Sequence, residues 1–303
     1  MKKPTISIGI PAYNEEANIK NLLLNLLDQK ANNFVLKEII VNSDGSTDDT
    51  VKIGKSVKDK RIKIISHSRR YGVNKAQNEI TRHATGDILV MINADVLPKD
   101  FHFLSNLIKP LLKDKNVGIV GANTISLPSR NLLERILANS HEMKQFLYSR
   151  ISNADNVFLC HGRARALSKE LYKQLVWPSD CPEDGYSYFF CKQKGFKFVF
   201  SKDASILFRS PARLEGHIRQ SNRFFHGLKQ LELLFPSDFI KTQLSFPKSL
   251  LIKTVLYYLI KNPVSTPAFL LISLYIRFFK NFKPDHFSKY DIVPTSKRII
   301  YET

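Results

Sequence analysis

The pattern of apolar and polar positions predicts alternating strands and helices through the first 121 residues. Short apolar runs of strand length alternate with segments in which apolar residues recur at helical spacing. The clearest strand is Ile88–Ile92, a continuous apolar run. The other predicted strands are Ile6–Ile10, Ile39–Val41, Ile62–Ile65 and Val117–Val120. This alternation predicts an α/β fold with a mostly parallel, doubly wound, Rossmann-like sheet flanked by helices.

Polar side chains follow three of these strands at the point where each strand ends. They are Asn14 and Glu15, the run from Asn42 to Asp44, and the run from Asn93 to Asp95. Because the carboxyl ends of parallel strands meet at one edge of a sheet, a single nucleotide-binding cleft there explains all three. Asn14 also suits the N-cap of the helix that follows, and helix capping is the alternative interpretation of Asp95.

After residue 121 the pattern changes, and a second half of the domain is predicted to extend to residue 240. Helices are expected over Leu132–Tyr148 and Arg213–Leu234, with strands over Val157–Cys160 and Phe196–Phe200. The acidic pair Glu183-Asp184 stands at an expected helix start.

Composition narrows the class of protein. The 303 residues are 43% hydrophobic and 24% charged, as in a folded chain, and carry a net charge of +19. This excess of positive charge is typical of proteins that bind nucleic acid, an anionic membrane or a phosphorylated substrate. Lysines exposed to solvent would also account for it. No nucleic-acid-binding signature is present, so we expect no nucleic-acid partner. Three cysteines without zinc spacing, and no secretion signal, indicate the cytoplasm.

Residues 241–303 form a separate basic segment with ten Lys or Arg and three acidic residues. Two apolar stretches, Leu250–Ile260 and Val264–Phe279, lie within it. A spanning helix needs about 20 apolar residues, so we favour helices that lie on an anionic membrane surface. A full span and packing against the core remain as alternatives. The predicted location is the cytoplasmic side of the cell membrane.

Two common phosphate-binding motifs are absent from the sequence. There is no G-x-G-x-x-G after the first strand and no G-x-x-x-x-G-K-[ST] anywhere, which argues against a dinucleotide enzyme or a P-loop NTPase. A diphosphate would then need another partner, and Asp95 with a divalent metal is the evident candidate.

Five segments together resemble the family 2 glycosyltransferases of the GT-A fold. Pro11–Glu16, Asn42–Asp48 and Asn93–Asp95 resemble the donor-binding motifs of that family. Glu183-Asp184 resembles its acceptor-side acidic pair, and Gln220–Phe224 resembles the Q-x-x-R-W motif of its processive, membrane-associated synthases. The resemblance covers residues 5 to about 235.

The chain departs from the family pattern at two positions. Asn93 stands where the family's D-x-D motif has its first aspartate, whereas Asp95 keeps the place of the metal-binding second aspartate. Phe224 stands where the synthases have tryptophan, and their many membrane helices are missing. Long processive polymer export is therefore not expected.

The resemblance implies inverting transfer of a sugar from a nucleotide diphosphate, UDP by family frequency, to a hydroxyl of a glycan or lipid-linked acceptor. Residues 1–121 would bind the nucleotide and 122–240 the acceptor. Asp95 would bind Mn²⁺ or Mg²⁺, Asp184 would be the general base, and Glu183 would support the site. The donor-binding residues it implies are Pro11, Tyr13, Glu15, Asp44, Asn93, Arg219, Gln220 and Arg223.

Some interpretations remain open at this point. His161 and His217 could contact acceptor, bind a second metal or be structural. A sugar-phosphate nucleotidylyltransferase shares the fold and substrates, but it should have a Gly-rich, Arg-containing loop where this chain has Pro11–Asn14. A non-catalytic basic module that binds membranes or nucleic acid would not need acids clustered at strand ends.

Overall fold

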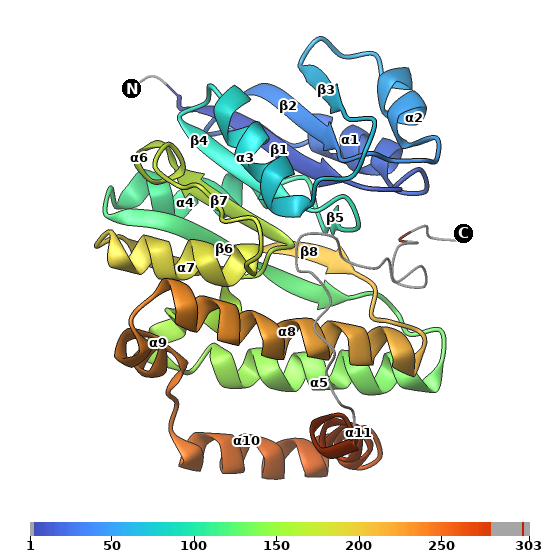
Figure 1. Ribbon diagram of the computed structural model, residues 1–303, viewed down its shortest axis with the longest axis vertical. Coiled ribbons are helices and arrows are strands. Elements are labelled where there is room, and N and C mark those ends of the chain that lie inside the picture. Colours follow the sequence, from blue (N-terminus) through green and yellow to red (C-terminus); the bar gives the residue numbers. More distant parts are fainter. Residues whose placement is uncertain (1–2, 280–298, 300–303) are drawn as a thin grey trace.

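The computed structural model describes residues 3–279 and residue 299. One mixed sheet of eight strands runs through it in the order β3-β2-β1-β4-β7-β6-β8-β5 (Figure 1). The last part of the predicted C-terminal segment, 280–298 and 300–303, lies outside the described residues. The strands are β1 Thr5–Ala12, β2 Val35–Ser43, β3 Ile62–Ser66, β4 Ile88–Ile92, β5 Leu97–Pro98, β6 Val117–Ser126, β7 Ala164–Ser168 and β8 Lys197–Phe208.

The first four strands are parallel, as the sequence predicts, but the rest of the sheet is mixed. β1 pairs in parallel with β2 and β4, and β2 with β3. β7 lies antiparallel between β4 and β6, whereas β6 and β8 are parallel. The parallel half brings the carboxyl ends of β1, β2 and β4 to one edge.

Helices cover both faces of the sheet. α1, Ile19–Leu27, and α4, Phe103–Lys113, pack against one face in the largest hydrophobic cluster. The opposite face is covered by another group of helices, which pack in a second cluster (Figure 1). That group comprises α3 Val73–His83, α6 Lys169–Tyr172, α7 Glu183–Gln193, α8 Leu214–Leu234 and α9 Ser237–Leu244. α2, Thr50–Ser56, packs beside α1.

The C-terminal helices pack on a helix of the second half of the domain. α5, Leu132–Tyr148, forms a third hydrophobic cluster with α10, Lys248–Lys261, and α11, Ser265–Phe279. Tyr258 of α10 and Phe269 of α11 are buried there. Within the described residues, no helix is both long enough and apolar enough to cross a membrane. Packing against the core, one of the alternatives considered for this segment, is thus seen for one face of each helix.

Two local predictions are wrong. Val157–Leu159 is a 3₁₀ turn instead of a strand, in a loop fixed by the buried Asn156 amide, which donates to the carbonyls of Tyr148 and Ile151. Asn14 does not cap α1, because the helix begins only at residue 19 and its N-cap is Asn18.

Candidate active site

Asn14 has a different local role, in the loop that follows β1. It takes the left-handed backbone conformation (φ 52°) and its side-chain oxygen accepts from the backbone N–H of Thr47 at 2.8 Å. Its own backbone N–H donates to Ser46 at 3.1 Å. These bonds tie the loop after β1 to the loop after β2, where the backbone N–H of Asp44 also donates to the Ala12 carbonyl at 2.9 Å.

Asp44 is buried at the end of β2 and is held by backbone donors. Its two carboxylate oxygens each accept one N–H, from Tyr71 and from Gly72, at 2.7 Å. The adjacent Gly45 has φ +71°, and a Cβ there would lie 2.4 Å from the backbone carbon of Arg69. The loop after β3 therefore closes tightly against the loop after β2, with Asp44 fixed between them.

Three cations lie over the rings of Tyr13 and Tyr71, and the sequence analysis did not single them out. The Arg70 guanidinium lies 4.0 Å from the ring centre of Tyr13. Arg69 and Lys75 lie over the ring of Tyr71, at 4.9 and 3.5 Å from its centre. The only signal for them was the dipeptide Arg69-Arg70 before Tyr71. A positive rim of this kind favours an anionic ligand at the strand edge.

Other predicted donor residues lie near this edge. Pro11 pairs with Asn42 across β1 and β2. Glu15 is buried and accepts a hydrogen bond from the Asn18 amide at 3.0 Å, while its backbone N–H donates to Thr50 at 2.7 Å. Glu15 is therefore part of the support beneath the loop.

Asp95 lies in the turn that follows β4 and is half-buried. It is not a helix cap, because the N-cap of α4 is His102, whose backbone N–H donates to Asp100 at 2.8 Å. The backbone N–H of Asn93 donates to the Arg163 carbonyl at 2.9 Å. That bond connects the loop carrying Asp95 to the loop that precedes β7.

The acidic pair opens α7, as the sequence predicts. The Asp184 carboxylate accepts the backbone N–H of Gly185 at 2.7 Å and that of Gly162 at 3.3 Å. A Cβ on Gly162 would lie 2.5 Å from Oε1 of Glu183, so a side chain there would require that carboxylate to shift. The loop around Gly162 thus contacts both acids.

Arg163 lies near the predicted metal ligand Asp95 and the predicted general base Asp184. Burial lowers the pKa of its guanidinium, whereas the charges of Asp95 and Asp184 raise it. The guanidinium also lies over the ring of Phe208, 3.9 Å from its centre. The charges of Asp95 and Asp184 therefore act on the same cation, which the sequence analysis missed.

Helix α3 holds the segment that leads into the acidic pair. The buried Asn74 amide donates to the carbonyls of Pro178 and Cys181, at 2.6 and 2.9 Å. The Asn78 amide donates to the Trp177 carbonyl at 2.8 Å, and the Trp177 indole N–H donates to the Glu183 carbonyl at 2.9 Å. The only sequence signal was a polar helix and the single tryptophan of the chain.

The remaining predicted residues lie on α8. Arg219 is exposed there, whereas Gln220 and Arg223 are half-buried. α8 packs against α7 near its end, where a Cβ on Gly185 would lie 2.9 Å from Leu231. The role of these three residues in donor binding stays a prediction.

A metal at this site would depend on few protein ligands. Across residues 3–279 and residue 299, no group of three or more His, Cys, Asp or Glu side chains is placed to hold a metal ion. Asp95 offers a hard carboxylate ligand, and Mg²⁺ sites often combine one or two carboxylates with substrate phosphates. The residues present fit a metal that binds together with a diphosphate.

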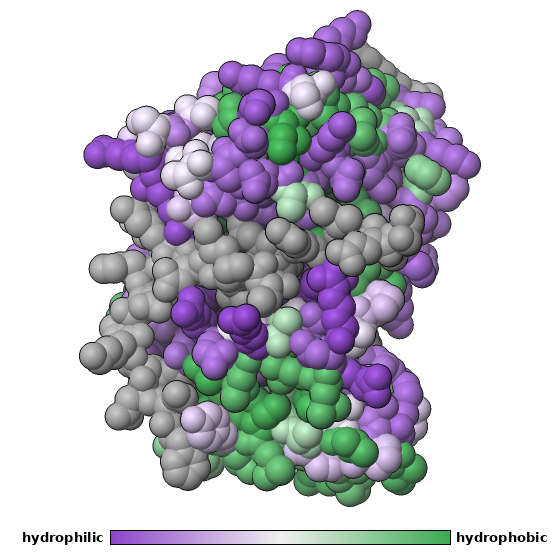
Figure 2. Space-filling model, turned by 90° about the vertical axis from the view of Figure 1, so that its right-hand side faces the viewer, coloured by the Kyte–Doolittle hydropathy of each residue, from purple (hydrophilic) through white to green (hydrophobic). Residues whose placement is uncertain are grey.

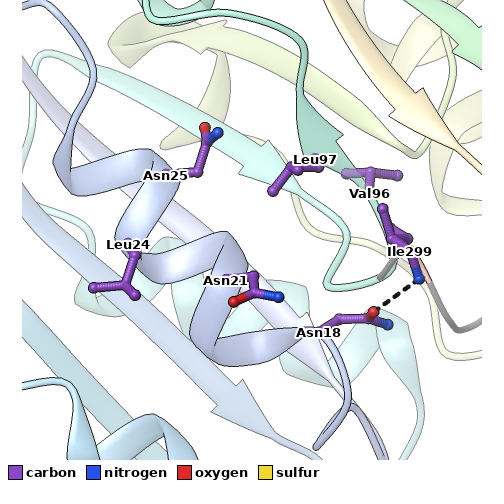
Figure 3. Close-up of a pocket in the computed structure, with 7 residues that line it drawn as sticks. All are labelled: Asn18, Asn21, Leu24, Asn25, Val96, Leu97 and Ile299. Atoms are coloured by element: carbon purple, nitrogen blue, oxygen red, sulfur yellow. Dashed lines mark hydrogen bonds between the residues drawn. The ribbon is translucent and has the colours of Figure 1, made fainter. Parts of the chain in front are cut away.

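A cavity of about 230 Å³ lies beside the donor half, between α1 and the loop after Asp95 (Figure 3). Asn18, Asn21 and Asn25 line one wall, and Val96 and Leu97 line another. The backbone N–H of Ile299 donates to the Asn18 side chain at 3.2 Å. Ile299 therefore lies against the N-terminal end of α1. The N-cap residue there, Asn18, also donates a hydrogen bond to Glu15.

Comparison with known proteins gives the class. Residues 7–176, more than half of the chain, match the family model "Glycosyl transferase family 2". The chain therefore belongs to glycosyl transferase family 2. This places it among the glycosyltransferases rather than with the nucleotidylyltransferases or non-catalytic modules considered from the sequence.

Solved structures with low sequence identity have the same fold. The mannosyltransferase PcManGT from Pyrobaculum calidifontis, solved in complex with GDP-Man and Mn²⁺, is 20% identical with a TM-score of 0.65. The match covers 93% of this chain and 89% of that one. Residues 1–349 of S. aureus TarS, in complex with UDP-GlcNAc, are 16% identical with a TM-score of 0.53, covering 72% and 65%. The architecture is the GT-A fold implied by the resemblance.

Curated relatives match over shorter regions. An uncharacterised glycosyltransferase of Haemophilus influenzae is 34% identical over 97 residues, which is 31% of this chain and 38% of that protein. The putative glycosyltransferase CsbB of Bacillus subtilis is 36% identical over 101 residues, or 32% and 30%. The chain thus matches only about a third of the length of these relatives.

Proposed function

We propose that the protein is an inverting, metal-dependent glycosyltransferase that moves a hexose from a nucleotide-diphosphate sugar to a hydroxyl of a glycan or lipid-linked acceptor. The observation that carries this proposal is the loop at Gly162 and Arg163, which is bonded both to the loop of Asp95 and to Asp184. The backbone N–H of Asn93 donates to the Arg163 carbonyl at 2.9 Å, and that of Gly162 donates to the Asp184 carboxylate at 3.3 Å. This arrangement supports a site in which a donor and an acceptor meet.

The nucleotide would bind at the ends of β1 and β2. The base lies against Tyr13 in this proposal, and Asp44 accepts its N–H. A carboxylate accepts only, which suits the N3–H of uracil and also the N–H groups of guanine. UDP is our choice of donor, while the GDP-Man complex of PcManGT makes GDP the natural comparison.

The diphosphate would lie between Asp95 and the arginines of α8. When bound, Mn²⁺ or Mg²⁺ supplies positive charge that stabilises the leaving diphosphate. Arg223, with Arg219, offers guanidinium donors that can bind phosphate oxygens in a bidentate manner. Asn93 contributes a neutral amide to the donor ribose or to a metal-bound water.

The acceptor hydroxyl would be deprotonated by Asp184. The oxygen of the acceptor hydroxyl attacks the anomeric carbon of the sugar on the face opposite the diphosphate. The new carbon–oxygen bond forms as the bond between the sugar and the diphosphate breaks, so the configuration at that carbon inverts. Asp184 receives the proton, a role that requires hydrogen-bond reach of the hydroxyl. Glu183, beside Gly162, orients the acceptor.

We also propose that α10 and α11 hold the protein against an anionic membrane. Their inner faces pack on α5, whereas Ile260, Leu271 and Phe278 are 84%, 67% and 71% exposed. Figure 2 shows hydrophobic side chains gathered over the lower part of the molecule, where Figure 1 places these helices. Apolar side chains flanked by basic residues favour shallow insertion among anionic headgroups.

A donor screen tests the enzymatic proposal. UDP-glucose, UDP-N-acetylglucosamine and GDP-mannose are incubated with the protein and Mn²⁺ or Mg²⁺, and donor hydrolysis is followed. We expect metal-dependent turnover of a UDP-sugar, inverted products once an acceptor is found, and loss of turnover in Asp95→Ala. Equal turnover in EDTA would contradict the metal assignment.

Liposome co-sedimentation tests the membrane proposal. Ile260→Gln combined with Phe278→Gln should lower binding to anionic vesicles, because it removes apolar side chains that insert without changing the net charge. Val176→Gln is the control, since Val176 is 65% exposed and belongs to the segment between α6 and α7. Absence of wild-type binding at low salt would overturn the proposal.

A further inference from the structure

Lys144 on α5 is a cation for which the described residues supply no anionic partner. It is half-buried, and no hydrogen bond or ion pair of its ammonium group occurs within the described part of the chain. Nζ lies over the ring of Phe269 on α11, 4.6 Å from its centre. Burial lowers the pKa of Lys144 to about 8.

His217 on α8 reaches the same aromatic ring from another side. Its ring centre is 6.5 Å from that of Phe269, and it is half-buried. Burial, and then the charge of Lys144, lower the pKa of His217 to about 4. At neutral pH its imidazole is therefore uncharged and carries one N–H donor.

A further imidazole extends this cluster along α5. His141 lies one helical turn before Lys144, and its Nε2 is 2.8 Å from the Thr124 hydroxyl. Burial first, and then the charges of Arg163 and Lys144, lower the pKa of His141 to about 3. Within the described residues, no ion pair joins Lys144, His141 or His217 to a carboxylate.

The cluster has a simple physical consequence. A partly buried cation without a counter-ion loses solvation and gains no ion pair in return, whereas an anion placed beside it restores that energy. A phosphate offers several acceptor oxygens, enough for one ammonium and one or two N–H donors, and hydrogen bonds between charged groups are the strong ones.

We propose that Lys144 and His217, with His141 behind them, bind the phosphate group of a phosphorylated acceptor at the junction of α5, α8 and α11. The inference rests on the proposed function, because it names the chemical class of the acceptor. Arg163 links the two places. Its guanidinium and the His141 ring lie 3.9 and 4.8 Å from the ring centre of Phe208, and the backbone N–H of the neighbouring Gly162 donates to Asp184. The acceptor hydroxyl would then lie on the side toward Asp184.

Binding of inorganic phosphate tests the subsite without requiring turnover. The full-length protein is titrated with phosphate and followed by ³¹P NMR line broadening and by the histidine ring signals. We expect Lys144→Gln to weaken binding about tenfold or more, His217→Gln to weaken it less, and Lys144→Arg to retain most of it. Lys113→Gln is the control, an exposed lysine in the last turn of α4.

Paired acceptors then distinguish a lipid phosphate from a soluble one. Farnesyl phosphate is compared with farnesol, and glycerol 3-phosphate with glycerol, using the donor found in the screen. We expect the phosphorylated member of one pair to be used, with a KM that rises about tenfold in Lys144→Gln at unchanged donor binding. Preference for farnesyl phosphate would identify a lipid source, and preference for glycerol 3-phosphate a soluble one.

The outcomes separate this inference from the proposed function. The subsite is overturned, even if transfer occurs, when the wild type binds phosphate no more strongly than Lys144→Gln does. Circular dichroism must show that both proteins are folded. Phosphate binding that depends on Lys144, with no donor turned over, leaves the subsite standing and contradicts the transferase proposal. Transfer to farnesol or glycerol as efficient as to their phosphates also overturns the inference.

Discussion

Asn74→Ala should weaken both folding and catalysis, because this amide is one of two on α3 that hold the segment leading into the acidic pair. The side chain is 1% exposed and donates two hydrogen bonds, to the carbonyls of Pro178 and Cys181. Alanine removes both bonds and leaves two carbonyl oxygens without this donor. A typical hydrogen bond contributes about 0.5–1.5 kcal/mol net, so the expected loss of unfolding free energy is about 1–3 kcal/mol.

The effect on catalysis follows from position. The segment from Trp177 to Cys181 leads directly into α7, so its displacement moves Asp184 and Glu183 while Tyr13 and Asp44 stay in place. We therefore expect kcat to fall at least tenfold, since small misplacements of catalytic groups are costly, with nucleotide affinity within twofold of wild type.

Urea unfolding and steady-state kinetics, measured at a temperature where the variant is folded, check both expectations. Asn21→Ala is the matched control: an exposed asparagine on α1 whose loss should change stability by less than about 0.5 kcal/mol. A variant with wild-type stability and wild-type kcat would refute the reasoning, since the two hydrogen bonds would then have no consequence.

Three further predictions concern single residues. Asp95→Ala should abolish the Mn²⁺ dependence of nucleotide binding by calorimetry, and an unchanged dependence would place the metal elsewhere. Burial raises the pKa of Glu38, but hydrogen bonds from Lys63 and its other donors prevail and bring it to about 2. Because this value lies below that of the unfolded chain, Glu38→Gln should cost about 3 kcal/mol in thermal or urea unfolding at pH 7, and the difference should shrink between pH 4.5 and 2; a constant difference contradicts it. Gly162→Ala should displace the Glu183 carboxylate and raise acceptor KM severalfold, whereas an unchanged KM would show that the carboxylate can move without cost.

The parallel half of the fold could be predicted because local pattern and tertiary environment agree there. Ile88–Ile92 is β4, with the bounds expected, and the long helix Leu132–Tyr148 of the second half is α5, also with the bounds expected. A buried parallel strand is a continuous apolar run, and an amphipathic helix keeps its period over many residues. Both patterns can be recognised in the sequence without knowing which elements pack against them.

The mixed half could not be predicted in the same way. β7 is only five residues long, and the fully buried Arg165 stands at its second position, a residue type that argues against a central strand. Its side chain is accommodated by a long-range partner, the Gln77 side chain on α3, which accepts from Nη2 at 2.9 Å. Pattern alone carries no information about such a partner.

The same limit applies to the candidate site. Residues at strand ends, such as Asp44 and Asp95, could be selected from sequence because strand direction places them together. Arg163, Asn74 and Lys144 could not, since each acts through contacts with residues distant in sequence. Their roles become visible only when β7, α3 and α11 are placed against the sheet and α5.

The most direct test of the central claim is the turnover of Asp184→Asn at saturating donor and acceptor, with Glu183→Gln measured beside it. Asparagine keeps the shape of the side chain and removes its basicity, so kcat should fall by about 10²–10⁴-fold while donor affinity is retained. Glu183→Gln should lose less, or act mainly on acceptor KM. Near-full transfer by Asp184→Asn with an inactive Glu183→Gln would reverse the assignment, and full transfer by both would contradict the role of the acidic pair altogether.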